Sequence, residues 1–151
     1  MISEVNNYEM LKLKNQLCFP IYLCSKEIVK KYNSVLNKYD LTYTQYIVMM
    51  YLWEMKESNV KDLGNTLLLD SSTLTPLLKK LENKGYIVRK RSNKDERNLI
   101  IKLTKKGNLL KKRLLNVPNI ISKCISLDEN DAKDLYRLTY KALLNIEKGD
   151  E

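Results

Sequence analysis

The chain has 151 residues, 44% of them hydrophobic and 30% charged, which predicts one soluble domain large enough to bury its own core. Four glycines and three prolines are too few for a loop-rich or all-β chain. No stretch of eighteen consecutive apolar residues occurs, and the N-terminus MISEVNNYEM lacks the basic and apolar pattern of a signal peptide. We therefore expect a cytoplasmic protein, in which three thiols do not predict structural disulfides.

The formal net charge of +9 is concentrated in one part of the chain. Between Lys56 and Arg113, sixteen Lys and Arg face six Asp and Glu, a net charge of +10. The remaining residues have eleven basic and twelve acidic side chains, a net charge of −1. Such a segment is typical of a surface that binds a polyanion such as nucleic acid. A lysine-rich face that contacts only solvent gives the same pattern, so charge alone does not decide.

Two helices are predicted in the first third of the chain. Apolar residues recur every three or four positions over residues 11–39, which predicts one long amphipathic helix. Residues 43–55, YTQYIVMMYLWEM, are nearly all apolar or aromatic. We expect this second helix to lie in the middle of the core.

Shorter elements follow. Residues 59–68 read as a short helix capped by Asn59, and Asp70 is a good N-cap for the helix SSTLTPLLKKLEN, which Gly85 ends. YIVRKRS and RNLIIKLT then form two strands joined by the turn NKDE. Thr104 caps a lysine-rich helix over about 105–124, interrupted by Pro118, and the capping box SLDE, Ser126 with Glu129, opens a last helix to about residue 147.

This order of a short helix, a tight turn, a second helix and a β-hairpin is that of a winged helix-turn-helix, so the predicted fold class is mainly α with a small β component (α+β). In residues 71–83, Leu74, Leu77, Leu78 and Leu81 form the stripe expected to be buried. An α-helix fits the major groove of DNA, where small hydroxyl side chains reach base edges and lysines reach phosphates. The predicted DNA contacts on this helix are Ser71, Ser72, Thr73, Thr75, Pro76, Lys79 and Lys80.

The hairpin supplies a basic wing. We expect its basic side chains to reach an adjacent minor groove or the DNA backbone, with Asp95 orienting one of the arginines. The alternative is a solvated surface hairpin in which Asp95 and Arg97 form a weak exposed pair. The predicted wing contacts are Arg89, Lys90, Arg91, Lys94, Asp95 and Arg97.

The runs LTYTQYIVMMYLWE and VKDLGNTLLLDSSTLTPLLKKLENKGYIVRKRSNKDERNLIIKLTKKG resemble the MarR family of winged-helix repressors. NQLCFPIY followed by KKYNSVLNKYDLTYTQY resembles its organic-hydroperoxide-sensing branch, the OhrR-type regulators. The resemblance spans roughly residues 11–145 and implies a homodimer that binds a pseudo-palindromic operator. One domain over 1–151 is then expected, with dimerisation helices at 11–39 and 105–147 and a DNA-binding part at 43–103.

In that branch a hydroperoxide oxidises the cysteine of the LCF motif, here Cys18, and the repressor leaves DNA. The resemblance implies that the thiol is held by tyrosine hydroxyls, which here correspond to Tyr22, Tyr32 and Tyr43. Tyr32 is fourteen residues beyond Cys18, about 21 Å along one helix. A contact between Cys18 and Tyr32 therefore requires a second subunit, whereas Tyr22, one turn from Cys18, can reach it within its own chain.

The other cysteines and Pro20 qualify this interpretation. Without the resemblance, Cys18 reads as a small buried hydrophobic residue. Cys124 is a candidate resolving cysteine in a two-cysteine mechanism, although it stands about one residue from the position that the branch uses. Cys24 points about 240° around the helix from Cys18, so we expect it to pack. Pro20 departs from the motif and either delays the start of the helix or kinks it.

The sequence leaves two switches open, oxidation of Cys18 and binding of a small aromatic ligand between the dimerisation and DNA-binding parts. We expect neither a cofactor nor a zinc site, because three scattered cysteines without histidine do not supply four ligands. An enzyme such as a thiol peroxidase is disfavoured, because Cys18 would be its only nucleophile.

Overall fold

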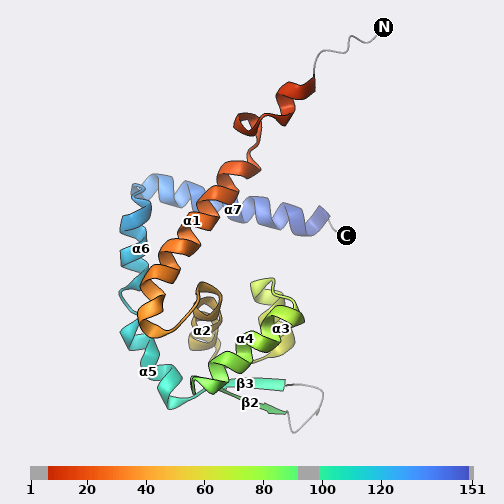
Figure 1. Cartoon of the computed structure of the whole chain (residues 1–151). Coiled ribbons are helices and arrows are strands. Elements are labelled where there is room, and N and C mark those ends of the chain that lie inside the picture. The colour runs from red at the N-terminus through yellow and green to blue at the C-terminus, as the bar shows by residue number, and fades with distance from the viewer. Residues whose placement is uncertain (1–6, 92–98, 150–151) are drawn as a thin grey trace. The chain divides into compact units, whose positions relative to one another are not determined.

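The structure, a computed structural model, describes residues 7–91 and 99–149 (Figure 1). The chain divides into two compact units, Met1–Val117 and Pro118–Glu151. The predicted class is confirmed, because helices predominate and a small antiparallel sheet accompanies them. The α-helices are α1 Cys18–Leu36, α2 Tyr43–Met55, α3 Val60–Leu67, α4 Ser71–Asn83, α5 Lys105–Arg113, α6 Val117–Ile125 and α7 Glu129–Gly149. The 3-10 helices are η1 Asn7–Leu11, η2 Leu13–Asn15 and η3 Asn37–Tyr39, and the strands are β1 Glu57–Asn59, β2 Ile87–Arg91 and β3 Leu99–Leu103.

The first long helix is shorter than the predicted range of 11–39. It begins at Cys18 and ends at Leu36, and 3-10 turns precede and follow it. Pro20 is its third residue, where the missing N–H would have no helical partner. A helix that began a turn earlier would set the proline ring against the carbonyl of Gln16. Pro20 therefore delays the start of the helix.

The core of the first unit is built around α2, which has the predicted bounds. Thr42 caps it and forms a capping box with Gln45. One side of α2 is fully buried through Val48, Met49 and Leu52. Around it lie the buried side chains Leu36, Leu41, Leu63, Leu74, Leu78, Leu81, Ile87, Ile101 and Leu110.

The sheet has the strand order β1-β3-β2, with both pairs antiparallel. The predicted hairpin is β2 and β3, which pair from Ile87 opposite Leu103 to Arg91 opposite Leu99. The three-residue strand β1 was not predicted, because ESN has no apolar alternation to mark it. It exists through pairing with β3, where Lys102 Nζ lies 2.5 Å from a Glu57 carboxylate oxygen.

The C-terminal helices differ from the prediction in two details. The interruption predicted at Pro118 within 105–124 is present but lies slightly earlier, because α5 ends at Arg113 and α6 begins at Val117 with Pro118 in its first turn. Ser126 does not cap the last helix, since its φ is 55°, which lies in the left-handed region. Asp128 is the cap instead, because its carboxylate accepts the N–H groups of Asn130 and Asp131, each at 2.9 Å.

In the second unit, α7 carries many exposed apolar side chains. They recur between residues 135 and 146: Leu135, Tyr136, Leu138, Tyr140, Leu143, Leu144 and Ile146. Across residues 7–91 and 99–149, no helix is both long enough and apolar enough to cross a membrane.

Gly107 provides a test of how α5 packs within the first unit. A Cβ added there would lie 2.1 Å from the carbonyl oxygen of Tyr86, while the Gly107 carbonyl accepts the Trp53 indole N–H at 2.9 Å. Alanine favours a helix over glycine by about 1 kcal/mol, but this overlap involves backbone atoms that cannot rotate away. We expect Gly107→Ala to lower the free energy of unfolding by about 2 kcal/mol or more in urea denaturation. Asn108→Ala, at the exposed neighbour, should change it little, and equal stability of the two variants would contradict the close approach.

Candidate nucleic-acid interface and thiol site

The turn between α3 and α4 is tight and depends on a glycine. Asn59 caps α3 by accepting the Asp62 N–H at 2.8 Å, as predicted. The helix ends at Leu68, whose φ of 50° is left-handed, and the Leu69 N–H donates to the Gly64 carbonyl at 2.9 Å. A Cβ on Gly64 would lie 2.9 Å from the Leu69 carbonyl oxygen, so glycine lets the turn pack against α3.

Asp70 begins α4 in the predicted manner. Its carboxylate accepts the Thr73 N–H at 2.7 Å and the Ser72 hydroxyl at 2.6 Å. These hydrogen bonds, first the one from Ser72, lower the pKa of the Asp70 carboxyl below its ordinary value. The start of α4 is thus fixed by an ionised cap, whose negative charge interacts favourably with the positive end of the helix dipole.

The two faces of α4 divide as the sequence predicts. The leucine stripe of Leu74, Leu77, Leu78 and Leu81 is buried. The opposite face carries every predicted DNA contact of this helix as an exposed side chain: Ser71, Ser72, Thr73, Thr75, Pro76, Lys79 and Lys80. Hydroxyls and lysines are thereby presented along one side of a helix that the turn and the hairpin flank (Figure 1).

The hairpin that follows supplies part of the predicted wing. Lys90 and Arg91 are exposed at the end of β2, while the Arg89 side chain is only 19% exposed. Lys94, Asp95 and Arg97 lie outside the described residues.

Arg89 is held by a partner that was not predicted from the sequence. Its Nε donates to the Glu82 carboxylate at 2.8 Å, its Nη2 lies 2.7 Å from the same oxygen, and its backbone N–H donates to the other oxygen at 2.9 Å. The hydrogen bond from the Arg89 side chain is the main cause that lowers the pKa of Glu82. Glu82 is the only acidic residue between 71 and 91, and a lone carboxylate among basic residues could have indicated an ion pair. The pair fixes the base of the hairpin to α4.

The predicted thiol site is in two parts on one chain. Cys18 is the first residue of α1 and is exposed, and Tyr22, one turn further on, is 59% exposed. Tyr32 and Tyr43 are half-buried, with their ring centroids 4.6 Å apart. Because α1 is continuous from Cys18 through Tyr32, the two residues are about 21 Å apart along it and cannot touch within one chain.

The tyrosine pair is built by the contact of α1 with the start of α2. Tyr46, 3% exposed, packs behind Tyr32 with ring centroids 5.9 Å apart. Asn33 on α1 accepts the backbone N–H of Tyr43 at 2.8 Å, which fixes the two helices to each other. Burial raises the pKa of Tyr32, Tyr43 and Tyr46, and neighbouring tyrosines raise it further for Tyr32 and Tyr46. These phenols therefore stay protonated at neutral pH and can donate hydrogen bonds.

The other two cysteines are also exposed in the single chain. Cys24 lies on α1 and Cys124 on α6, which belongs largely to the second unit. Cys24 was predicted to pack, but among the residues that the structure describes its side chain is exposed. Among the residues that the structure describes, no group of three or more Cys, Asp or Glu side chains is placed to hold a metal ion.

Fold and site together define a winged helix-turn-helix protein with a thiol at the start of its first long helix. A family model described as the transcriptional regulator SarA/Rot matches residues 30–114. The chain belongs to this family of transcriptional regulators, and the predicted resemblance to MarR-type, OhrR-like regulators is confirmed.

Individual relatives agree with this family. The chain is 44% identical over 133 residues to the organic hydroperoxide resistance transcriptional regulator of Bacillus subtilis, covering 88% of each protein. It is 50% identical over 123 residues to the regulator SarZ of Staphylococcus aureus, covering 82% of this chain and 83% of SarZ. A solved structure of reduced AbfR bound to DNA is 34% identical, with a TM-score of 0.77 over 93% of this chain and 98% of that chain.

The pairing of Glu82 with Arg89 predicts a pH-dependent stability. Because the pKa of Glu82 is lowered, the pair stabilises the fold fully above the ordinary value of 4.5, and the stabilisation is lost as the pH falls through the lowered pKa. We expect Glu82→Gln to lower the free energy of unfolding at pH 7 by about 1 kcal/mol after solvent screening. The difference in free energy of unfolding between Glu82→Gln and the unmodified chain should become smaller as the pH falls below 4.5. Glu57→Gln, at the exposed pair with Lys102, is the control and should cost less than about 0.5 kcal/mol; equal losses would show that the Glu82 pair has no special role.

Proposed function

We propose that this chain is a cytoplasmic, homodimeric repressor that leaves its operator DNA when an organic hydroperoxide oxidises Cys18. The observation that carries the proposal is the separation along α1 of an exposed Cys18 from Tyr32, which packs against Tyr43 at the start of α2. Two copies related by a two-fold axis, with their α1 helices antiparallel, would complete two identical sites. The similarity to an organic hydroperoxide resistance regulator supports hydroperoxide as the oxidant.

DNA binding is assigned to α4 and to the hairpin. The exposed hydroxyls near the start of α4 can hydrogen-bond to base edges in the major groove. Lys79 and Lys80 can contact the phosphates on either side of that groove. Lys90 and Arg91 extend the basic surface along β2. The likeness to reduced AbfR bound to DNA supports this mode of docking.

Dimerisation is assigned to the N-terminal segment and to the C-terminal helices. Leu17, Ile21 and Tyr22 surround Cys18 and are 76%, 48% and 59% exposed, so apolar surface beside the thiol is uncovered in the single chain. The exposed apolar side chains of α7 make a second such surface. Contiguous exposed apolar surface is typical of a subunit interface, and a second copy is the partner that also supplies the tyrosines.

The proposed reaction consumes one hydroperoxide for each thiol. The Cys18 thiolate attacks the terminal oxygen of ROOH, so that an S–O bond forms and the O–O bond breaks. Proton uptake then gives a sulfenic acid and the alcohol ROH. The neutral hydroxyls of Tyr32 and Tyr43, supplied by the partner subunit's copy of α1 and α2, would stabilise the thiolate. We assign a regulatory rather than an enzymatic role, because the matching family model and the similar proteins are transcriptional regulators.

The sulfenic acid has two possible fates in this chain. The thiol of Cys124 of the partner subunit can displace water from it to form a disulfide between the subunits, or a small cellular thiol can displace water to form a mixed disulfide. Cys124 is exposed at the C-terminal part of α6, which permits the first reaction, and the exposure of Cys18 permits the second.

Two cysteine variants test the proposal. We expect Cys18→Ser to bind DNA from upstream of the chain's own coding region with unchanged affinity and to stay bound after cumene hydroperoxide is added. Cys24→Ser, on the same helix, should be released like the unmodified protein. Fluorescence anisotropy at constant salt measures both, since affinity for DNA depends steeply on salt. Release of Cys18→Ser would exclude Cys18 as the sensor, and release by a salicylate-like compound in both variants would favour the ligand switch.

Mixed dimers test whether the site is shared between subunits. One subunit carries Cys18→Ser, and the other carries Tyr32→Phe and Tyr43→Phe. If the thiol of one subunit meets the tyrosines of the other, this mixed dimer keeps one intact site, and its remaining Cys18 should oxidise at the normal rate. If the contacts lie within a subunit, that thiol faces only phenylalanines and should oxidise as slowly as in the homodimer of the double Tyr variant. The measurement is the loss of the Cys18 thiol with time, followed by mass spectrometry.

A further inference from the structure

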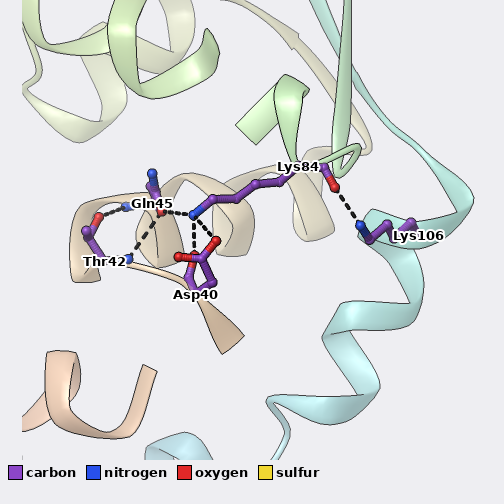
Figure 2. A network of polar contacts seen from close by, with 5 residues as sticks. All are labelled: Asp40, Thr42, Gln45, Lys84 and Lys106. Atoms are coloured by element: carbon purple, nitrogen blue, oxygen red, sulfur yellow. Dashed lines mark hydrogen bonds and ion pairs between the residues drawn. The ribbon is translucent and has the colours of Figure 1, made fainter. Parts of the chain in front are cut away.

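A single lysine ties the end of α4 to the turn that precedes α2 (Figure 2). Lys84 is the C-cap residue of α4 and follows its last residue, Asn83. Its Nζ donates to the backbone carbonyl of Asp40, lies 3.1 Å from the Asp40 carboxylate and donates to Gln45 Oε1 at 3.3 Å. Its side chain is only 23% exposed, although Asp40 is 86% exposed. One ammonium group therefore has three acceptors on a segment about forty residues away in sequence.

The acceptors are themselves held in place. Gln45 is 4% exposed, and its side-chain oxygen also accepts the Thr42 N–H at 3.2 Å as part of the capping box of α2. Asp40 has a left-handed backbone with φ of 53°, and its N–H donates to the Asn37 carbonyl. The position of Lys84 Nζ is thus set by the geometry of this turn rather than by a mobile surface carboxylate.

The same turn is joined to the helix that carries Cys18. Tyr43 follows directly after Thr42, and its backbone N–H donates to Asn33 of α1 at 2.8 Å. The Tyr43 ring packs on Tyr32 of α1. A shift of the tyrosine pair therefore moves the segment on which the Lys84 ammonium rests.

The backbone around Lys84 is itself held by α5 and by the residue that caps it. Its carbonyl accepts Lys106 Nζ of α5 at 2.7 Å, as Figure 2 shows. The next residue, Gly85, has a left-handed φ of 72°, and its carbonyl accepts the Thr104 hydroxyl at 2.6 Å. Any displacement of the Lys84 side chain is therefore passed to the end of α4 rather than lost in a flexible tail.

The energy of these contacts indicates a role in orientation. Partly exposed ion pairs add little to stability because water screens them. Three acceptors converging on one ammonium nevertheless specify a position. α4 has 13 residues and is about 20 Å long, so a tilt of about 3° at its anchored end moves its DNA-facing start by about 1 Å. Such a displacement is large compared with the tolerance of base-edge hydrogen bonds.

We propose that Lys84 is a positioning residue that couples the tyrosine pair of the thiol site to the recognition helix α4. In the reduced protein it holds α4 at the angle that binds DNA, and after Cys18 is oxidised it carries the displacement of the α1–α2 turn to α4. This role rests on the proposed function, because it presupposes that oxidation weakens DNA binding. It assigns no DNA contact to Lys84 itself.

The test compares the ratio of dissociation constants, oxidised over reduced, which we call the release factor. The probe is a duplex from upstream of the chain's own coding region, and the oxidant is cumene hydroperoxide. Lys84→Met removes the three contacts, whereas Lys84→Arg keeps the charge and the hydrogen-bond donors. Asp40→Asn removes the carboxylate, and asparagine adopts the left-handed backbone of this position readily. Lys80→Met is the matched control, because it removes the same charge from the same helix one turn earlier. The rate of Cys18 oxidation is followed in parallel.

We expect Lys84→Met to lower the release factor at least about fivefold, the lower end of usual coupling between sites, while Cys18 oxidises at an unchanged rate. Lys84→Arg should restore the release factor. Lys80→Met should weaken both forms alike and leave the factor unchanged, since it removes one phosphate contact. Asp40→Asn should also lower the factor, although loss of a negative charge by itself would only favour DNA binding in both forms.

The outcomes separate this inference from the proposed function. If the unmodified protein is not released by the hydroperoxide, the proposed function fails and the coupling role fails with it. If the unmodified protein is released and Lys84→Met has the same release factor, only the coupling role is overturned. Circular dichroism checks that Lys84→Met is folded. If it is not, Asp40→Asn decides, and an unchanged release factor in that variant overturns the inference.

Discussion

The unbroken course of α1 from Cys18 to Leu36 is the constraint on which the rest of this structure depends. A helix is rigid over this length, so the thiol at its start and Tyr32 near its end are kept about 21 Å apart. The first turn of α1 and the residue before it also present apolar side chains to solvent beside the thiol, namely Leu17, Ile21 and Tyr22. The exposed apolar surface is unfavourable for an isolated subunit, and the separation leaves the thiol without the tyrosines expected to hold it. A second copy that covers the exposed segment and supplies its own tyrosines removes both problems. Pro20 is compatible with this arrangement because it lies in the first turn, where it breaks no helical hydrogen bond.

α2 connects the parts of the first unit. Its start is fixed by its own capping box, by Asn33 from α1 and by Lys84 from the end of α4. Further along, Trp53 donates to the Gly107 carbonyl and so joins α2 to α5. The surrounding core is fully buried leucine, isoleucine and methionine, and close packing of this kind transmits displacements rather than absorbing them. A change at the tyrosine pair therefore has a direct physical route to the helix that we expect to read DNA.

Local sequence features predicted most of the helices and the faces they bury. Asn59, Asp70 and Thr104 cap their helices as expected, and the leucine stripe of α4 is buried, because capping and periodicity depend on residues only a few positions apart. Features that depend on distant partners were missed. The strand β1 exists only through β3, Arg89 pairs with Glu82 across a helix–strand junction, and Lys84 meets Asp40 and Gln45 only in the folded chain. Ser126 failed as a cap because its left-handed backbone leaves Asp128 in the capping position.

The central claim is that oxidation of Cys18 is the event that ends DNA binding. It is tested most directly by titrating the reduced protein, bound to its upstream DNA, with cumene hydroperoxide while DNA release and the Cys18 thiol are measured in the same samples. We expect DNA release to rise in step with loss of this thiol, to be complete at no more than one equivalent of oxidant per subunit, and to be reversed by dithiothreitol. DNA that stays bound after the Cys18 thiol has been fully oxidised would contradict the central claim.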